Sequence, residues 1–184
     1  MRVIYVFFSG LFALVERAAG GWFLGLAARL TFASVLLGYF LNSALTKVGS
    51  GFPDMFIPGT GAYAQILPSI TRAVSYDIDK ISFFPWGLIV TMGTYAEFVL
   101  PVLIVLGLFT RLAALGMIGF IAVMSYVDIA FHGVDAETIG APFDRVPDAL
   151  ISDQRLLWVF PLLYLLIRGA GAVSLDALLA RFFR

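Results

Sequence analysis

Four apolar runs, each long enough to cross a lipid bilayer, do most to limit what this chain can fold into. A helix needs about 20 largely apolar residues to span the hydrocarbon core of a membrane. Each run should be helical, because lipid offers no hydrogen-bond partners to an unpaired backbone. We therefore predict an all-α integral membrane four-helix bundle, with spans at approximately 22–45, 84–109, 112–131 and 156–171.

The composition supports a membrane protein and excludes several chemistries. Hydrophobic residues make up 61% of the chain and charged residues 13%, whereas soluble domains are about half apolar and a quarter charged. The net charge is zero, so no long-range field favours nucleic acid. The chain has no cysteine and one histidine, which excludes thiol catalysis, Cys-ligated metal and bis-His haem ligation by this chain. A redox role would need a bound organic cofactor or a partner subunit.

The predicted spans leave two long outer loops, at 46–82 and 132–154, within a single membrane domain that covers 1–184. The connection near Thr110 is short, so the second and third spans should form an antiparallel hairpin. In the first loop, apolar residues recur at helical spacing and predict a short amphipathic helix on the membrane surface, broken at Pro68. These residues are Tyr63, Ile66, Leu67, Ile70 and Val74.

Both ends of the chain have amphipathic character. The opening run, MRVIYVFFSGLFALV, is too short to span the bilayer before Glu16 and Arg17 intervene. We expect an N-terminal interfacial helix that leads into the first span, in preference to a signal-peptide core. At the other end, SLDALLARFFR places its leucines and Phe182 on one face. This pattern predicts a C-terminal amphipathic helix capped by Ser174.

The distribution of Lys and Arg orients the chain in the membrane. The positive-inside rule assigns the side with more of these residues near the span ends to the cytoplasm. The side with both termini holds Arg2, Arg17, Arg111, Arg168, Arg181 and Arg184, and the other side holds Lys47, Arg72, Lys80, Arg145 and Arg155. The margin is small, and it predicts that both termini are cytoplasmic.

Two ionisable residues, Arg29 and Glu97, lie deep within the predicted spans. A lone charge near the bilayer centre costs at least about 2.5–3.5 kcal/mol, so such residues are usually paired or functional. A rise of about 1.5 Å per residue puts the two at depths that differ by roughly 8 Å, which an arginine side chain can cover. We therefore expect a buried Arg29–Glu97 pair. It would either fix helix register or line a proton or ligand site.

Other polar side chains could complete a ligand site. Tyr95 lies two residues before Glu97, and its phenol could donate to a carbonyl or carboxylate, although tyrosine is also common at membrane interfaces. Asp128 and His132 share a helical face at the outer end of the third span. His132 could relay protons, and Lys47 could contact Asp128. One histidine among acids lacks the repetition of a usual zinc site, so the sequence predicts no metal site.

Three stretches resemble the DoxX family of bacterial inner-membrane proteins. AEFVLPVLIVLGLFTRLAAL resembles that family's second-span glutamate and the GL-x-TR-x-AA turn into the third span. ARLTFASVLLGYFLNSALTKV resembles the first span, with its arginine and terminal lysine. DQRLLWVFPLLYLLIRGAGAVSLDALL resembles the last span and its Gly-rich, Ser-Leu-Asp tail. Carried over residue by residue, the resemblance singles out Arg29, Lys47, Glu97 and Arg111.

The resemblance implies a four-helix bundle in the bacterial inner membrane, and some DoxX relatives are subunits of thiosulfate:quinone oxidoreductase. The leading hypothesis is a small redox-associated subunit that binds a quinone, or a similar lipid-soluble molecule, inside the bundle. Glu97 would shuttle protons, and Arg29 would tune its carboxylate and polarise a carbonyl. The ligand site would also include Lys47, Tyr95, Arg111, Asp128 and His132.

Two other functions remain open from the sequence. One is a non-catalytic assembly or stabilising subunit of a larger membrane complex. The other is a small transporter, for which four spans are few unless the chain forms a dimer. Besides the lipid bilayer, the partners would be other membrane subunits or further copies of this chain.

Overall fold

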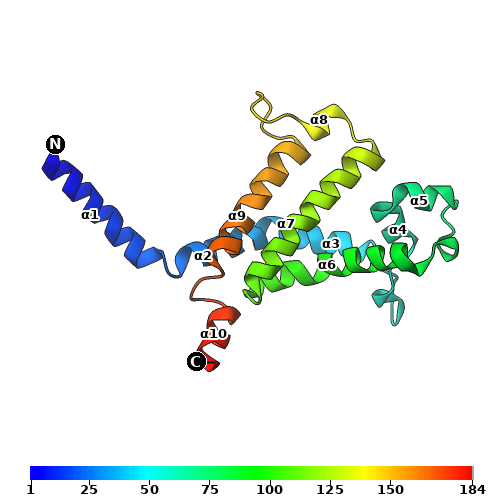
Figure 1. The fold of residues 1–184 in the computed structure, drawn as a ribbon, viewed down its shortest axis with the longest axis horizontal. Helices are drawn as coiled ribbons and strands as arrows, with labels where there is room; N and C mark the ends of the chain where they lie inside the picture. Colours follow the sequence, from blue (N-terminus) through cyan, green and yellow to red (C-terminus); the bar gives the residue numbers. More distant parts are fainter. Residues whose placement is uncertain (184) are drawn as a thin grey trace.

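The computed structural model describes residues 1–183, and the regular elements in that range are helices, with one isolated β-bridge between Val48 and Pro58 (Figure 1). The first half contains α1 (Arg2–Ala19), α2 (Phe23–Phe32), α3 (Gly38–Leu45), α4 (Thr60–Ile66) and α5 (Pro68–Ala73). The second half contains α6 (Leu88–Leu106), α7 (Thr110–Val127), α8 (Ala136–Ile139), α9 (Arg155–Arg168) and α10 (Leu175–Phe182).

Within residues 1–183, four helical segments are long and apolar enough to cross a membrane: Phe23–Leu45, Phe83–Leu106, Thr110–His132 and Leu150–Arg168. The first joins α2 to α3 through a π-helical segment at Ala33–Leu37, and the third continues α7 through Asp128–His132. The prediction of an all-helical chain with four such segments is confirmed. The last segment begins at Leu150 and not near 156. It ends at Arg168 because Gly169 turns the backbone to a φ of +81°.

The four segments pack as two antiparallel pairs, α2–α3 with α6 and α7 with α9. The pairs are joined by α2 on α9 and by α6 on α7, which form the predicted antiparallel hairpin. At one end, residues 107–109 join α6 to α7, and we call this the turn end. The opposite end carries the loops 46–82 and 132–154, and we call it the loop end. From the turn end, α6 and α7 diverge toward the loop end, where α4 and α5 lie beside α6 (Figure 1).

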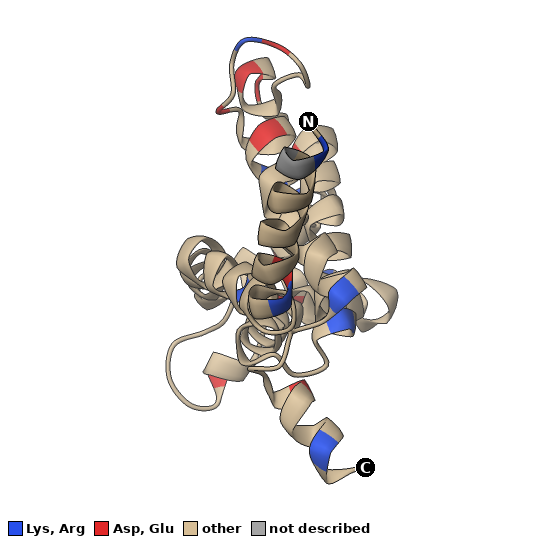
Figure 2. Ribbon diagram, turned by 90° about the vertical axis from the view of Figure 1, so that its left-hand side faces the viewer, with Lys and Arg blue, Asp and Glu red and all other residues tan. Residues whose placement is uncertain are grey.

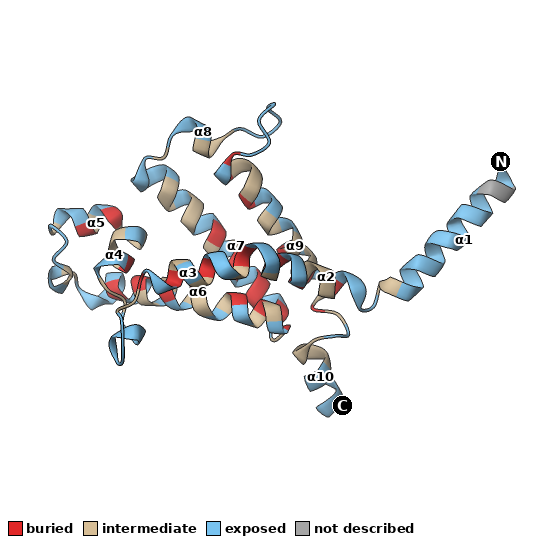
Figure 3. Cartoon of the chain, turned by 180° about the vertical axis from the view of Figure 1, so that it is seen from behind, coloured by how far each residue is buried: buried red, intermediate tan, exposed pale blue. Residues whose placement is uncertain are grey.

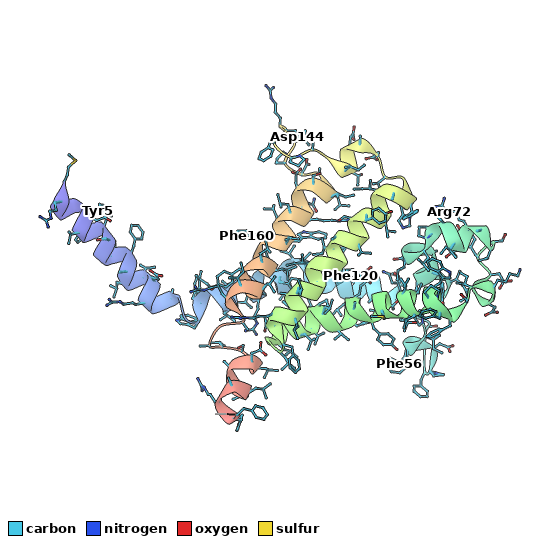
Figure 4. The ribbon with its side chains drawn as sticks, in the orientation of Figure 1. Tyr5, Phe56, Arg72, Phe120, Asp144 and Phe160 are labelled. Carbon is cyan, nitrogen blue, oxygen red and sulfur yellow. The ribbon has the colours of Figure 1, made fainter. Side chains whose placement is uncertain are left out.

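The buried core lies where the two pairs meet (Figure 3). Phe32 and Phe40 stack with their ring centroids 6.5 Å apart, and Phe120 of α7 meets Phe40 edge-on at 5.9 Å. Phe120 lies where α7 crosses the first pair (Figure 4). The remaining fully buried apolar side chains include Leu36, Ile104, Met117, Leu162 and Leu165. The core is therefore aliphatic toward the turn end and aromatic near its middle.

The two terminal helices stand outside this core. Nearly every described side chain of α1 is exposed, and the helix projects away from the bundle (Figures 1 and 3). Lys, Arg, Asp and Glu cluster at helix ends and in loops, which leaves long uncharged stretches along the spans (Figure 2). A membrane-embedded chain has this distribution, because charges are tolerated at its aqueous edges.

The long loops are partly helical. Pro68 is the first residue of α5, and the preceding Leu67 has φ −127° and ψ 58°, so the surface helix is broken at the predicted place. In the other loop, Asp135 caps α8 by accepting a hydrogen bond from the Thr138 backbone N–H at 2.7 Å. That hydrogen bond lowers the pKa of the Asp135 carboxyl below its usual range.

Candidate functional site

The buried carboxylate of Glu97 pairs with Lys47, and this pair replaces the expected Arg29–Glu97 contact. The Lys47 Nζ lies 2.9 Å from Glu97 Oε2 and also donates to the Ser43 hydroxyl at 2.8 Å. The two charged side chains are only 4% and 5% exposed. Lys47 follows the end of α3 and extends back along the bundle toward Glu97 in α6. A lysine at a span end can reach inward in this way, because four methylenes carry its ammonium.

Arg29 is occupied elsewhere, at the turn end. Leu108 N–H bonds to Leu103 O and Gly107 N–H to Ile104 O, so the backbone itself satisfies two of the last carbonyls of α6. The Arg29 Nη2 donates to the next carbonyl, that of Val105, at 2.6 Å. Its Nη1 donates to the carbonyl of Val173. Arg29 therefore caps the negative end of α6 and ties it to the segment before α10.

Gly107 and Asp176 complete this junction. Gly107 has a φ of +70°, and a Cβ built on it would lie 2.7 Å from the Ser174 Cβ, so the position requires glycine. The two carboxylate oxygens of Asp176 accept the backbone N–H groups of Phe109 and Thr110 at 2.7 and 2.9 Å. Asp176 thus caps the start of α7, where a carboxylate is favoured by the helix dipole.

The Lys47–Glu97 pair lines a cavity of about 420 Å³ near the loop end. The cavity lies between α6 and α7, with α3 on one side and α4 at its outer end. Its walls are mainly apolar, including Ile89, Ile66, Phe120 and Val127. Met92 and Val123 also line it and are 65% and 62% exposed, so the cavity opens between α6 and α7 onto the lipid-facing surface.

Small residues make room for this cavity. Gly93 and Ala96 on α6 face it together with Gly116 and Gly119 on α7. A Cβ added at Gly119 would meet no atom within 4 Å, whereas one at Gly116 would lie 3.2 Å from a methyl of Leu100. Gly119 therefore borders open space, and Gly116 allows α6 and α7 to approach each other.

Two polar contacts close the outer mouth of the cavity. Asp128 lines it and pairs with Arg155 of α9, and the Arg155 Nη1 donates to the Ser125 hydroxyl at 2.9 Å. Asp128 therefore contacts Arg155, and the alternative Lys47–Asp128 contact that the sequence allowed is not formed. The His132 Nε2 lies 3.0 Å from the Gln65 carbonyl oxygen, which joins the end of the third span to α4.

The structure thus gathers Glu97, Lys47, Asp128 and His132 around one cavity and leaves Tyr95 and Arg111 elsewhere. The Tyr95 hydroxyl donates to the Phe56 carbonyl at 2.7 Å, because a residue two positions from Glu97 points away from it on a helix. Arg111 lies at the turn end, beside Arg168 and Gly169.

Sequence reasoning missed several residues of the site. Arg155 stands in the sequence next to an outer loop, yet it is 4% exposed and neutralises Asp128. Ser43 lies four residues before Lys47, and this i,i+4 spacing could have identified it as the lysine's partner. Gly116 and Gly119 are three residues apart and so share one helical face, which could have indicated a small-residue face on α7.

The fold and the cavity define a class of protein: a small multi-pass membrane protein whose bundle holds a charged pair beside a lipid-accessible cavity. The family model for DoxX matches residues 24–133, and the chain belongs to the DoxX family. Every residue that lines the cavity falls inside this range. No curated protein and no solved structure matches the chain.

Proposed function

We propose that the protein is a redox-associated membrane subunit that binds a quinone, or a similar lipid-soluble carbonyl compound, in the cavity at Lys47 and Glu97. One observation carries the proposal: a buried ion pair lines a cavity whose other walls are apolar and whose opening faces lipid. Ligand sites in proteins are commonly apolar cavities of about 300–1,000 Å³ with a few converging polar groups. A cavity of about 420 Å³ fits a ring-sized headgroup.

The charged pair offers both a donor and an acceptor to such a headgroup. Only one carboxylate oxygen of Glu97, Oε2, bonds to Lys47, so Oε1 keeps acceptor capacity toward the cavity. Oε1 can therefore accept a hydrogen bond or a proton from a hydroxyl group in the cavity. The Lys47 ammonium holds the carboxylate in place and favours negative charge on a nearby oxygen. A bound quinone would supply reversible electron and proton transfer.

Electrons would need a partner subunit. The chain has no cysteine and one histidine, so it has few groups that could hold a metal relay. Asp128 and His132 lie at the outer mouth, between the ion pair and the loops. These two side chains would give protons a route between Glu97 and the aqueous phase.

The test is to purify the protein gently, extract bound organic molecules and quantify any quinone by mass spectrometry. Two variants address the cavity by different means: Glu97→Gln removes the acceptor charge, and Gly119→Leu fills the open space beside it. Asp77→Asn is the matched control, because Asp77 is an exposed carboxylate paired with Lys80 outside the cavity. Folding of each variant is checked by its elution as a single species.

We expect a roughly stoichiometric quinone in the wild type and in Asp77→Asn, and its loss from both folded cavity variants. Absence of any small molecule from the wild type would count against the proposal. Equal retention by folded Gly119→Leu would also refute this site, since the added side chain would occupy space that the headgroup needs.

We further propose that the protein lies in a bacterial inner membrane with the turn end and both termini in the cytoplasm. Two of the loop-end cations, Lys47 and Arg155, are buried and paired, so they add little to the exposed charge there. The exposed loop-end cations are Arg72, Lys80 and Arg145, and those of the other side include Arg2, Arg17, Arg111, Arg168 and Arg181. When only exposed cations are counted, the excess of Lys and Arg on the side with both termini is therefore larger, which favours a cytoplasmic position for that side. A reporter enzyme that works only in the cytoplasm should be active when fused to either terminus, and one that works only in the periplasm should be inactive there.

A second candidate function is that of a non-catalytic assembly subunit. It is favoured by α1, which exposes Phe7, Phe8 and Phe12 away from the bundle. A helix with such a surface can lie in the membrane interface or against a partner protein. Phe8→Ser/Phe12→Ser should then abolish co-purification of a larger complex while quinone retention stays unchanged. An intact complex in this variant would reject the role of α1.

A further inference from the structure

The turn end carries two arginines that no carboxylate neutralises in the part of the chain described. Arg111 lies in the first turn of α7, Arg168 is the last residue of α9, and both side chains are exposed. No ion pair among residues 1–183 includes either of them. Arg111 and Arg168 also line a second depression together with Asp176, but the two oxygens of Asp176 already accept backbone N–H groups and form no ion pair with either arginine. The two positive charges therefore remain available to a ligand.

A cavity of about 410 Å³ is lined by both arginines and by Tyr164. Tyr164 and Arg168 are four residues apart on α9 and so share one helical face. A Cβ built on Gly169 would lie 3.6 Å from the Arg111 Nε, so the guanidinium of α7 reaches the turn that follows α9. The remaining lining is largely glycine backbone, from Gly20, Gly21, Gly25 and Gly171.

This set of groups suits a phosphate. Guanidinium groups bind phosphate oxygens through paired, charge-assisted hydrogen bonds, and a phenol adds a further donor. Glycine walls leave a tetrahedral anion free to approach the backbone closely. We propose that the cavity at Arg111, Tyr164 and Arg168 binds the phosphate of an anionic phospholipid, separately from the ligand cavity at Lys47 and Glu97.

The position of the site favours a lipid phosphate over a free one. Arg111 and Arg168 lie at the very ends of two membrane-spanning segments, where lipid headgroups meet water. Leu112 and Ile167 stand next to them in sequence and are 70% and 67% exposed, which gives acyl chains an apolar surface beside the arginines. Basic pockets between spans bind anionic headgroups elsewhere for the same reasons.

Native mass spectrometry with equal amounts of phosphatidylglycerol and phosphatidylcholine in the micelles tests the proposal. The wild type should retain phosphatidylglycerol over phosphatidylcholine by roughly 10–30-fold, because both lipids have a phosphate but only phosphatidylglycerol carries a net negative charge for the two arginines to attract. Arg111→Gln/Arg168→Gln should reduce that ratio to near one. Arg17→Gln/Arg181→Gln is the matched control, because it removes two exposed arginines elsewhere and should keep the ratio.

Three results would overturn the site. The first is a wild type that does not prefer phosphatidylglycerol, and the second is a double variant that keeps the preference. The third is a control variant whose ratio of phosphatidylglycerol to phosphatidylcholine falls as far as that of the double variant. Inorganic phosphate added as a competitor separates the two sources of phosphate. Displacement of the lipid by an equal concentration of inorganic phosphate would refute the lipid assignment. If the glutamine variant fails to fold, Arg111→Lys/Arg168→Lys keeps the charge and should lower the ratio several-fold through loss of the paired hydrogen bonds.

Discussion

Replacement of Lys47 by methionine should destabilise the protein strongly, because it leaves the Glu97 carboxylate buried without a counter-charge. The two side chains are 4% and 5% exposed, and the Nζ–Oε2 distance is 2.9 Å. Removal of one partner from such a buried pair costs about 3–5 kcal/mol. For a chain of this length, that cost corresponds to a fall in melting temperature of roughly 6–20 °C. Methionine keeps the apolar length of the lysine, so lost packing contributes little.

The chain contains a matched control for this experiment. Lys80 and Asp77 form an ion pair with the same 2.9 Å separation, but their side chains are 68% and 44% exposed. Lys80→Met should therefore leave the melting temperature almost unchanged, because an exposed ion pair contributes little to stability. The two pairs differ in burial and not in N–O distance, so the comparison isolates burial as the cause.

Fluorescence-detected size-exclusion chromatography after heating gives the melting temperature of each variant in the same detergent. The double variant Lys47→Met/Glu97→Gln removes both charges and should recover most of the loss. The reasoning is refuted if Lys47→Met and Lys80→Met lower the melting temperature equally. It also fails if the double variant is as unstable as Lys47→Met alone.

Three further predictions concern the junction at the turn end and its contrast with the cavity. Arg29→Gln should lower the stability by about 1.5–3 kcal/mol through lost charge-assisted hydrogen bonds. Quinone retention per folded chain should not change, and its loss would contradict the placement of Arg29 outside the ligand cavity. Gly107→Ala should lower the stability by at least about 1–2 kcal/mol, because the φ of Gly107 is +70° and the new Cβ would crowd Ser174. Gly119→Ala is the control, because its new Cβ meets open space, and its melting temperature should be no lower than that of the wild type. Equal melting temperatures for the two variants would contradict this expectation. Asp176→Ala should cost about 1 kcal/mol and speed hydrogen exchange at the two N–H groups that it caps; unchanged exchange there would exclude the cap.

The four spans could be predicted from the sequence because length and hydropathy decide them locally. The break at Pro68 was predictable for the same reason, since a proline imposes it on its own neighbours. The bounds of the last span were less accurate, because they depend on the π-helical segment at Leu150–Gln154 and on the backbone turn at Gly169. Both features follow from local geometry that hydropathy does not encode.

The pairing of charges could not be predicted from depth alone. Arg29 and Glu97 lie at reachable depths, but depth along a span does not fix which way a side chain faces. The free carbonyl of Val105 takes Arg29, and Glu97 then pairs with a lysine from beyond the end of α3. Backbone carbonyls at helix ends are also possible partners for a buried arginine, and they account for the first contact.

The charged residues shared with the DoxX pattern therefore divide into two groups with different physical roles. At the turn end, Arg29 is held by backbone carbonyls, so it fixes the ends of helices and has little donor capacity left for a ligand. Near the loop end, Lys47 and Glu97 neutralise each other beside a cavity, so a ligand can reach one carboxylate oxygen without breaking the fold. The cavity walls come from the spans, whereas its outer end is closed by Gln65 and His132. We therefore expect changes in that outer contact to alter which ligand is held, and changes at the turn end to alter whether the bundle folds.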